Sequence, residues 1–367
     1  MPPVHYDPDL FPPEQLIDWP SLIPLIGPAA AAVARYDGML EVVPNPELLL
    51  VPLSVREAVL SSRIEGTQAS VIDVLEIQAG RKTTSARLLG DAQEIRNYAL
   101  AMRKAEEMLE KLPLSNRVVR AAHKLLLSGA RGHNKAPGTY RRIPNWIGPP
   151  GCTVEEATFV PVSAEQLPDA LSRWERHIQE DPPDVLVQAA TLHAEFEALH
   201  PFLDGNGRLG RMLVPLFLWS RGVISRPVFY ISAYLEANRD AYYERLLAIS
   251  RDGDWTGWCR FFLTAIQKQA VDNLAKTRGI LSLYEEMKPR VVAATRSQYA
   301  IHALDSIFET PILSSAGFAD RAGIPKPTAH RLLQKLQQRD ILTEIRPSSG
   351  SQAAILSFPA LLEVLSD

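Results

Sequence analysis

Cysteine is scarce in this sequence, and so are long apolar runs. The chain has two cysteines in 367 residues, Cys152 and Cys259, and their spacing matches neither a CxxC pair nor a zinc ribbon. This excludes a disulfide framework and indicates a reducing compartment. The apolar stretch 22–34 is too short to span a bilayer and is broken by two prolines and a glycine. The first residues lack the pattern of a signal peptide. We therefore expect a soluble, cytoplasmic protein that makes no membrane contact.

An excess of positive charge is also missing. The formal net charge is −3 and the sequence pI is about 6.3, which argues against a globally basic nucleic-acid-binding protein and leaves room only for a local basic face. Hydrophobic residues make up 46% of the chain, enough for a large core and about two or three domains.

Helical periodicity dominates what is present. Apolar residues recur every three or four positions through most of the chain, which predicts a mainly α-helical fold. A proline-rich arm over the first residues is expected to lead into a helix. Further helices are predicted over residues 46–64, 70–80, 91–112, 116–128, 165–179, 184–199, 208–221, 233–250 and about 256–303, the last with a break at Pro289.

Two regions depart from this helical pattern. Residues 132–162 are rich in glycine, proline and asparagine and contain two strand-like segments, 145–148 and 157–161, which predicts a β-hairpin. The last sixty or so residues form a winged helix-turn-helix pattern. Its predicted parts are helices 314–322 and 327–339 and strands 341–346 and 352–358, the strands joined by Pro347-Ser348-Ser349-Gly350.

The segment that carries chemistry runs from His193 to Arg211 and reads HAEFEALHPFLDGNGRLGR. A helix ends near Leu199, and a loop containing Gly205 and Gly207 leads directly into another helix. Glycines at positive φ let successive backbone N–H groups point into one concavity, and the next helix adds the positive end of its dipole. The sequence therefore predicts an anion-binding loop.

Charged side chains around this loop specify the anion further. Arg208 and Arg211 lie in the first turn of the helix, where two cations oppose the macrodipole at a cost of roughly 0.3–1 kcal/mol each. A nucleotide triphosphate would offset that cost. His200 can accept a proton near neutral pH, and Asp204 supplies a hard oxygen ligand for Mg²⁺. We expect the other two histidines considered, His123 and His193, to be structural.

The loop matches the signature H-x-F-x-(D/E)-G-N-G-R-x-x-R at every defined position, and the chain resembles the Fic family over about residues 20–265. Residues 137–148 look like that family's flap, and residues 234–243 are similar to its adenosine-side helix. The resemblance implies a Fic-type helical core with a β-hairpin flap, next to the C-terminal winged-helix module. The implied divisions are an N-terminal helical region 1–112, a catalytic core 113–265, a helical linker 266–305 and a winged helix-turn-helix 306–367.

The same resemblance implies a protein adenylyltransferase, which transfers AMP from ATP to a Ser, Thr or Tyr hydroxyl of a target protein, the chain itself included. His200 would be the general base and Asp204 would hold Mg²⁺, while the flap, 144–161, would align the target by strand addition. The implied phosphate contacts are Gly205, Asn206, Gly207, Arg208 and Arg211, and the implied adenosine contacts are Tyr234, Asn238 and Tyr242.

A second motif resembles the family's inhibitory helix. Ser61-Ser62-Arg63-Ile64-Glu65-Gly66 fits (S/T)-x-x-x-E-(G/N) within a helix expected at about 47–66. Ser61 and Glu65 are four residues apart and so share one helix face. The implied role of Glu65 is to compete with the γ-phosphate for Arg211, and removal of AMP from a modified target stays open as a second activity.

Other functions remain open at this point. The segment 314–350 is a candidate for DNA binding, with Arg331 and Lys335 as the pair expected on one helix face, but such a module also serves as a homodimer contact. One alternative is therefore a DNA-binding regulator whose Fic-like domain only senses nucleotide. Another is an enzyme of the same fold that uses a different donor, such as UTP or CDP-choline.

Overall fold

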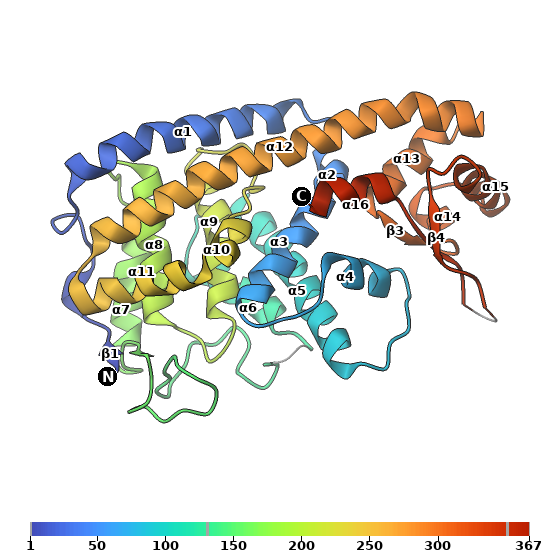
Figure 1. The fold of residues 1–367 in the computed structure, drawn as a ribbon. Coiled ribbons are helices and arrows are strands. Elements are labelled where there is room, and N and C mark those ends of the chain that lie inside the picture. The colour runs from blue at the N-terminus through green and yellow to red at the C-terminus, as the bar shows by residue number, and fades with distance from the viewer. Residues whose placement is uncertain (1, 130–131, 350–351, 367) are drawn as a thin grey trace.

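The computed structural model describes residues 2–129, 132–349 and 352–366 and is mainly helical, as the sequence predicts. Two long helices, α1 (Trp19–Val42) and α12 (Trp255–Thr295), pack along each other and form one side of the molecule (Figure 1). Prolines at 24 and 28 lie inside α1, and the helix continues through both. Together, α1 and α12 cover one side of the helices that flank the loop 200–211.

The centre of the core is α8 (Val185–Leu199), which is buried along nearly its whole length. It packs against α7 (Leu167–Gln179), α9 (Asn206–Ser220) and α12. Asp184 caps its first turn by accepting a hydrogen bond from the Val187 N–H at 2.9 Å. Because α8 is locked on several sides, the residue at its end is held rigidly.

The remaining helices of the N-terminal and central regions surround this core. Their bounds are α2 (Pro46–Leu49), α3 (Val51–Ile64), α4 (Val71–Gln78), α5 (Ala86–Leu109), α6 (Asn116–Leu126), α10 (Ser232–Ala237) and α11 (Arg239–Asp252). A capping box formed by Ser70 and Asp73 starts α4, and the Ser85 side chain accepts from Leu88 N–H at the start of α5.

The predicted hairpin is present in a narrow form. Ile147 makes a single antiparallel bridge to Phe159, with Ile147 N–H donating to the Phe159 carbonyl at 2.9 Å. Phe159 is also the first residue of β2 (Phe159–Val160). The other edge of β2 pairs in parallel with β1 (Val4–His5). The expected extended arm is thus a strand of the flap, preceding a 3-10 turn at Pro8–Leu10.

The C-terminal region is a winged helix, as predicted. It contains α13 (Ala300–Glu309), α14 (Phe318–Arg321), α15 (Lys326–Gln337), α16 (Pro359–Ser366) and a sheet of order β3–β5–β4 with strands Ile312–Ser314, Ile355–Ser357 and Thr343–Arg346. The predicted helix 314–322 is shorter than expected, because residue 314 ends β3 and residues 315–317 form a turn before α14. Gly350 of the predicted connection lies outside the described residues.

Three sequence expectations about this half need correction. The helix does not break at Pro289 but runs on to Thr295, where Arg296 ends it at a left-handed φ of 48°. The predicted helix 233–250 is two helices separated at Asn238. Lys335, expected to face DNA, donates from Nζ to the Thr295 carbonyl at 2.7 Å and so fastens the module to the end of α12.

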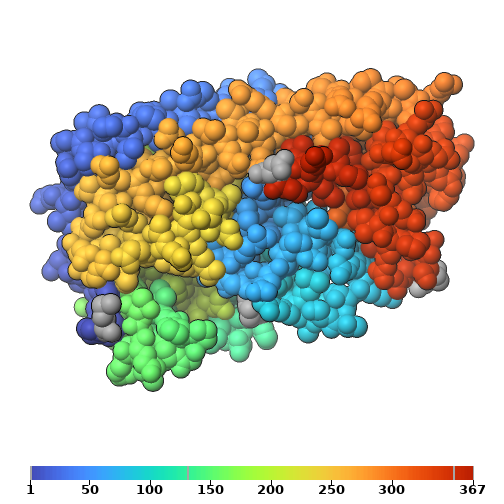
Figure 2. Space-filling model, in the orientation of Figure 1, coloured from blue at the N-terminus to red at the C-terminus, as the bar shows by residue number. Residues whose placement is uncertain are grey.

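Helix α3 is covered by the C-terminal module. Both α13 and α16 pack against α3, and β3 packs against α4. Figure 2 shows the module (red) in contact with this blue-to-cyan region. Among the described residues, none of the helices is both long enough and apolar enough to cross a bilayer.

Candidate active site

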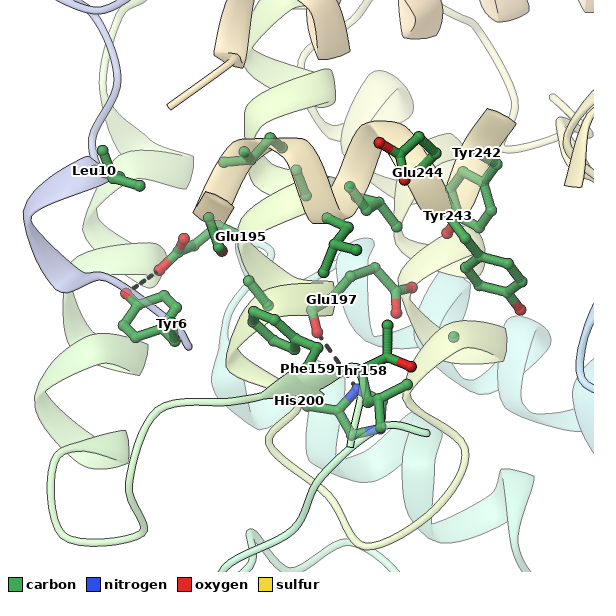
Figure 3. A pocket seen from close by; sticks show the side chains of 18 of the residues that line it. Tyr6, Leu10, Thr158, Phe159, Glu195, Glu197, His200, Tyr242, Tyr243 and Glu244 are labelled. Atoms are coloured by element: carbon green, nitrogen blue, oxygen red, sulfur yellow. Dashed lines mark hydrogen bonds between the residues drawn. The ribbon is translucent and has the colours of Figure 1, made fainter. Parts of the chain in front are cut away.

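The end of α8 opens into a cavity of about 510 Å³, shown in Figure 3. Its walls come from α8, the start of α9, α11, the flap and the N-terminal arm. Tyr6 and Leu10 lie at one end of the view, and Tyr242 and Tyr243 lie at the other. His200 lies at the bottom between them, so one cavity collects the predicted loop, the flap and α11.

His200 terminates α8 in the left-handed region, at a φ of 44°. A residue other than glycine rarely adopts this conformation, and such strain is typical of functional positions. Its Nδ1–H donates to the Glu197 carbonyl at 3.4 Å, which leaves Nε2 with a free lone pair. Burial lowers the pKa of the imidazole to about 4, against an opposing effect of Glu65, so the ring is neutral at physiological pH.

The backbone of His200 is fixed by Arg141, just before the flap, and by Asn145, at the start of the flap. Arg141 Nε donates to its carbonyl at 3.0 Å, and Asn145 Nδ2 donates to the same oxygen at 3.2 Å. Asn145 also reaches the Phe202 carbonyl at 3.2 Å. The position of His200 is therefore coupled to the base of the flap.

The loop after His200 is closed by its own asparagine. Asn206 accepts from Phe202 N–H and donates back to the Phe202 carbonyl, both at 2.9 Å. The side-chain oxygen and one N–H of Asn206 are therefore used within the loop, and its implied contact with phosphate stays a prediction. Its backbone N–H, at the start of α9 after Gly205 (φ 80°), is still part of the predicted nest.

His123, expected to be structural, supports the same loop from below. Its Nδ1 accepts from Gly138 N–H at 2.8 Å, so Nε2 carries the proton and donates to the Asp204 carbonyl at 2.9 Å. The ring stacks on Phe202 with centroids 3.6 Å apart. Burial lowers the pKa of His123 to about 4, which keeps this bonding pattern intact at neutral pH.

Arg211 is held by the predicted inhibitory motif. Its Nη2 donates to Glu65 Oε1 and to the Ser61 carbonyl, both at 2.8 Å, and its Nε donates to Ser61 Oγ at 2.9 Å. Burial would raise the pKa of Glu65, but the guanidinium outweighs this and holds the pKa below its usual range. Glu65 follows α3 as its C-cap, just before Gly66 at a φ of 91°.

Glycine at position 207 is required by this contact. A Cβ there would collide with Glu65 Oε1 and would lie 3.0 Å from Arg211 Nη1. Gly207 therefore lets the carboxylate lie directly over the N-terminus of α9, where a negative charge is favoured.

Arg208 makes a separate set of contacts. Its Nη1 donates to Glu94 Oε2 at 2.9 Å and its Nη2 to Asp204 Oδ1 at 3.1 Å. Both Arg208 and Glu94 are buried, whereas the Asp204 side chain is 33% exposed. Sequence reasoning missed Glu94, because it lies on α5, 114 residues before Arg208 in the chain.

These ion pairs change the expectation about the two arginines at the N-terminus of α9. From the sequence, a bound nucleotide triphosphate was expected to offset the positive charge of Arg208 and Arg211. The structure places Glu65 against Arg211 and Glu94 against Arg208, so protein carboxylates already neutralise both. Of these two carboxylates, Glu65 lines the cavity and Glu94 does not, so an anion that enters the cavity to reach Arg211 would have to compete with Glu65.

One of the three residues implied as adenosine contacts lies at the far end of the cavity. Tyr242 lines the cavity, but Tyr234 and Asn238 are not among the residues that line it. Asn238 Nδ2 donates to the Tyr234 carbonyl at 2.9 Å, and the centroid of the Tyr234 ring lies 6.0 Å from that of Phe261. The next turns of α11 supply the apolar wall, through Leu246, Leu247 and Ile249.

His193, expected to be structural, joins three helices beneath that wall. It donates from Nδ1 to the Gly210 carbonyl at 3.1 Å and accepts at Nε2 from Tyr242 O–H at 2.9 Å. Burial lowers its pKa to about 3. It fixes α8 to α9 and α11 and does not face the cavity.

Two acidic residues of α8 were missed by sequence reasoning. Glu195 accepts from the Tyr6 hydroxyl at 2.7 Å, and burial raises the pKa of this carboxyl to about 7. Burial also raises the pKa of Glu197 to about 8, against the opposing charge of Arg211. Both line the cavity. Their sequence signal is that two acidic residues, two positions apart, lie in a largely apolar helix.

A model described as Fic/DOC family matches residues 113–218, and a model of the Fic/DOC family N-terminal region matches residues 23–107. The chain belongs to the Fic/DOC family. These two matches contain the whole loop from His200 to Arg211 and the helix that ends at Glu65. A third model, of the IclR helix-turn-helix domain, matches residues 311–345 of this Fic-family chain.

Relatives and solved structures agree with this membership. The protein adenylyltransferase Fic of Drosophila persimilis is 24% identical over 267 residues, which cover 70% of this chain and 49% of the relative. That of Drosophila grimshawi is 23% identical over 211 residues, which cover 56% and 40%. The chain thus spans about half the length of the curated relatives it matches.

Two solved structures show the same fold. A Fic family protein from Desulfovibrio desulfuricans G20 aligns with a TM-score of 0.60 at 21% identity, covering 92% of this chain and 96% of that one. Fic-1 from C. elegans aligns with a TM-score of 0.51 at 19% identity, covering 71% and 74%.

Proposed function

We propose that this chain is a protein adenylyltransferase that transfers AMP from ATP to a hydroxyl group of a protein, and that Glu65 holds it in an inhibited state. The observation that carries the proposal is the contact of Glu65 with Arg211 inside the cavity that also contains His200. The Drosophila relatives, named as protein adenylyltransferases, support it. The domain divisions inferred from the sequence belong to this proposal.

His200 acts as the general base in the proposed reaction. Its Nε2 lone pair is free because Nδ1 donates to the Glu197 carbonyl, and its lowered pKa keeps it unprotonated. It accepts the proton of the target hydroxyl as that oxygen attacks the α-phosphorus and pyrophosphate leaves. The backbone N–H groups at the start of α9 stabilise charge on the phosphoryl oxygens.

The residues at Asp204 fit Mg²⁺. The carboxylate is partly exposed, gives one oxygen to Arg208 and keeps hard oxygen atoms available. A Cβ at Gly132 would sit 2.5 Å from Asp204 Oδ2, so glycine there leaves room beside the carboxylate. Asp204 would hold the ion, which neutralises phosphate charge when bound.

Inhibition follows from a competition for one side chain. With Glu65 on Arg211, the guanidinium is not available to the terminal phosphate, and ATP binds poorly or out of line. When α3 moves or Glu65 is replaced, Arg211 is free to pair with that phosphate through charge-assisted bonds. AMP removal, with Glu65 positioning a water, is kept as an open second activity of the same site.

Transfer of label tests this proposal. ATP labelled at the α-phosphate is incubated with Mg²⁺ and the purified chain, alone and with a soluble cell extract as a source of targets. We expect Glu65→Gly to label protein more strongly than wild type, and Glu65→Gly/His200→Ala to lose about 10²–10⁴-fold of that rate. ATP labelled at the γ-phosphate must give no label. Equal labelling with both nucleotides would indicate phosphoryl transfer and contradict the proposal. Competition by unlabelled UTP and CDP-choline tests the alternative donors.

A second candidate function, DNA binding, rests on the winged helix and its match to the IclR helix-turn-helix domain. The exposed side of α15 presents Lys326, His330 and Arg331. We propose that this side contacts duplex DNA, with a homodimer contact as the competing use. Gel mobility of duplex DNA with wild type and Arg331→Ala tests it: a retarded band that Arg331→Ala weakens supports DNA binding, and an unchanged mobility opposes it.

A further inference from the structure

A second groove, of about 820 Å³, lies at the base of the flap. One wall is α6, and the others are the segments 137–142 and 164–168, which enter and leave the flap region. Its lining contains five cationic side chains: Arg117, Arg120, Lys124, Arg141 and Arg142. Within the part of the chain that the structure describes, no aspartate or glutamate lines it.

The cations of this groove lack the ion pairs that other surface arginines have. Across residues 2–129, 132–349 and 352–366, none of the five lies within 4.0 Å of a carboxylate oxygen. Arg120 donates only to the Gly138 carbonyl, at 2.9 Å, and lies over the Tyr140 ring. By contrast, Arg251 and Arg290 each contact a glutamate at 2.9 Å.

Glu175 and Glu165 lie near the lining residues of the groove and do not neutralise it. Glu175 is occupied by the start of α6, where it accepts from Asn116 N–H at 2.8 Å and from Asn116 Nδ2 at 2.9 Å. Glu165 is next to the lining residue Ala164 and is fully solvated, so water screens its effect on Arg141. The groove therefore keeps its positive charge.

The spacing of these residues makes the charge a continuous strip. Arg117, Arg120 and Lys124 are at positions i, i+3 and i+7 of α6 and so share one face of that helix. Arg142 adds a fourth exposed cation from the opposite wall. Like charges held together repel one another, and in a chain of net charge −3 an anionic partner is the physical counterpart of such a strip.

We propose that this basic groove binds an acidic segment of the target protein, an inference that rests on the proposed transferase function. The groove is bounded by both ends of the segment that carries the flap. Arg141, on its wall, also donates to the His200 carbonyl, so this residue links the groove directly to the loop that begins at His200. Nucleic acid is the weaker choice, because α6 lies far from α15 across the molecule (Figure 1).

Fluorescence anisotropy with a labelled ten-residue polyglutamate peptide tests the groove directly on the full chain. The groove variant is Arg117→Ser/Arg142→Ser, two exposed side chains without ion pairs. The matched control is Arg251→Ser/Arg290→Ser, which removes the same charge elsewhere on the surface. We expect the groove variant to raise the Kd of the peptide about tenfold and the control to leave it unchanged. Raising the salt concentration should weaken wild-type binding.

Three outcomes overturn the inference. One is equal peptide affinity in the groove and control variants. Another is no peptide binding by wild type at low salt. The third is a duplex of 20 base pairs that binds wild type more tightly than the peptide and loses affinity in the groove variant, which assigns the groove to nucleic acid. Self-labelling of Glu65→Gly with α-labelled ATP is measured in parallel: its absence counts against the transferase function, while peptide binding reports on the groove alone.

Discussion

The contact between Glu65 and Arg211 predicts how ATP affinity responds to one isosteric change. Arg211 is almost completely buried and makes three hydrogen bonds, two to Ser61 and one to Glu65. Glu65→Gln keeps the shape and removes the charge, so the guanidinium becomes available to a phosphate while Ser61 still holds it in place.

The magnitude follows from the geometry of that contact. A hydrogen bond between charged groups contributes about 1.5–3 kcal/mol. The Glu65 side chain is 34% exposed, and solvent screening places the contact at the lower end, about 1.5 kcal/mol. ATP no longer has to displace this charge in Glu65→Gln, so its Kd should fall about tenfold. The same change should lower the melting temperature slightly, because a buried cation loses its counter-charge.

Isothermal titration calorimetry with Mg-ATP measures this effect. A His200→Ala background prevents turnover, so that binding is measured alone. Glu76→Gln is the control, since Glu76 also pairs with an arginine, Arg81, but lies outside the cavity. If Glu65→Gln and Glu76→Gln leave the affinity equally unchanged, Glu65 does not compete with the phosphates and the proposed inhibition is wrong.

Three further perturbations test the supporting contacts. Glu94→Gln leaves buried Arg208 with Asp204 as its remaining carboxylate, and urea unfolding should show a loss of about 3 kcal/mol, whereas an unchanged midpoint would exclude a structural role for this pair. Tyr6→Phe removes the hydroxyl bound to Glu195 and should destabilise the chain by about 1–2 kcal/mol, while Tyr243→Phe, whose hydroxyl makes only a 3.4 Å contact, should have almost no effect. Glu197 has a pKa of about 8 beside Arg211, so this carboxyl gains negative charge as the pH rises through 8. ATP should therefore bind more weakly at pH 9 than at pH 7. This change in affinity with pH should be absent in Glu197→Gln, and a change that persists in that variant would assign the effect to another group.

The sequence was sufficient for the parts of the site that are contiguous in the chain. The loop 200–211 carries its own chemistry, and two glycines followed by a helix define its backbone. The inhibitory helix was also predictable as an element, although its contact with Arg211 needed the resemblance to a family. The helical class followed from periodicity, and the winged helix from its order of helices and strands.

The parts that could not be predicted depend on residues far apart in the chain. Glu94 meets Arg208 across 114 residues and Tyr6 meets Glu195 across 189, and neither pair leaves a local pattern. The single helix expected over 233–250 was wrong because Asn238 separates two helices, a break with no proline or glycine to signal it. At Pro289 a helix break was predicted and none is present, since α12 continues through this proline.

The position of bound nucleotide tests the central claim most directly. Crystals of Glu65→Gly soaked in Mg-ATP should show the phosphates over the start of α9, the terminal phosphate on Arg211, and the α-phosphorus facing His200 Nε2. A loop without nucleotide at saturating ATP, or a nucleotide whose α-phosphate lies away from His200, would contradict the account.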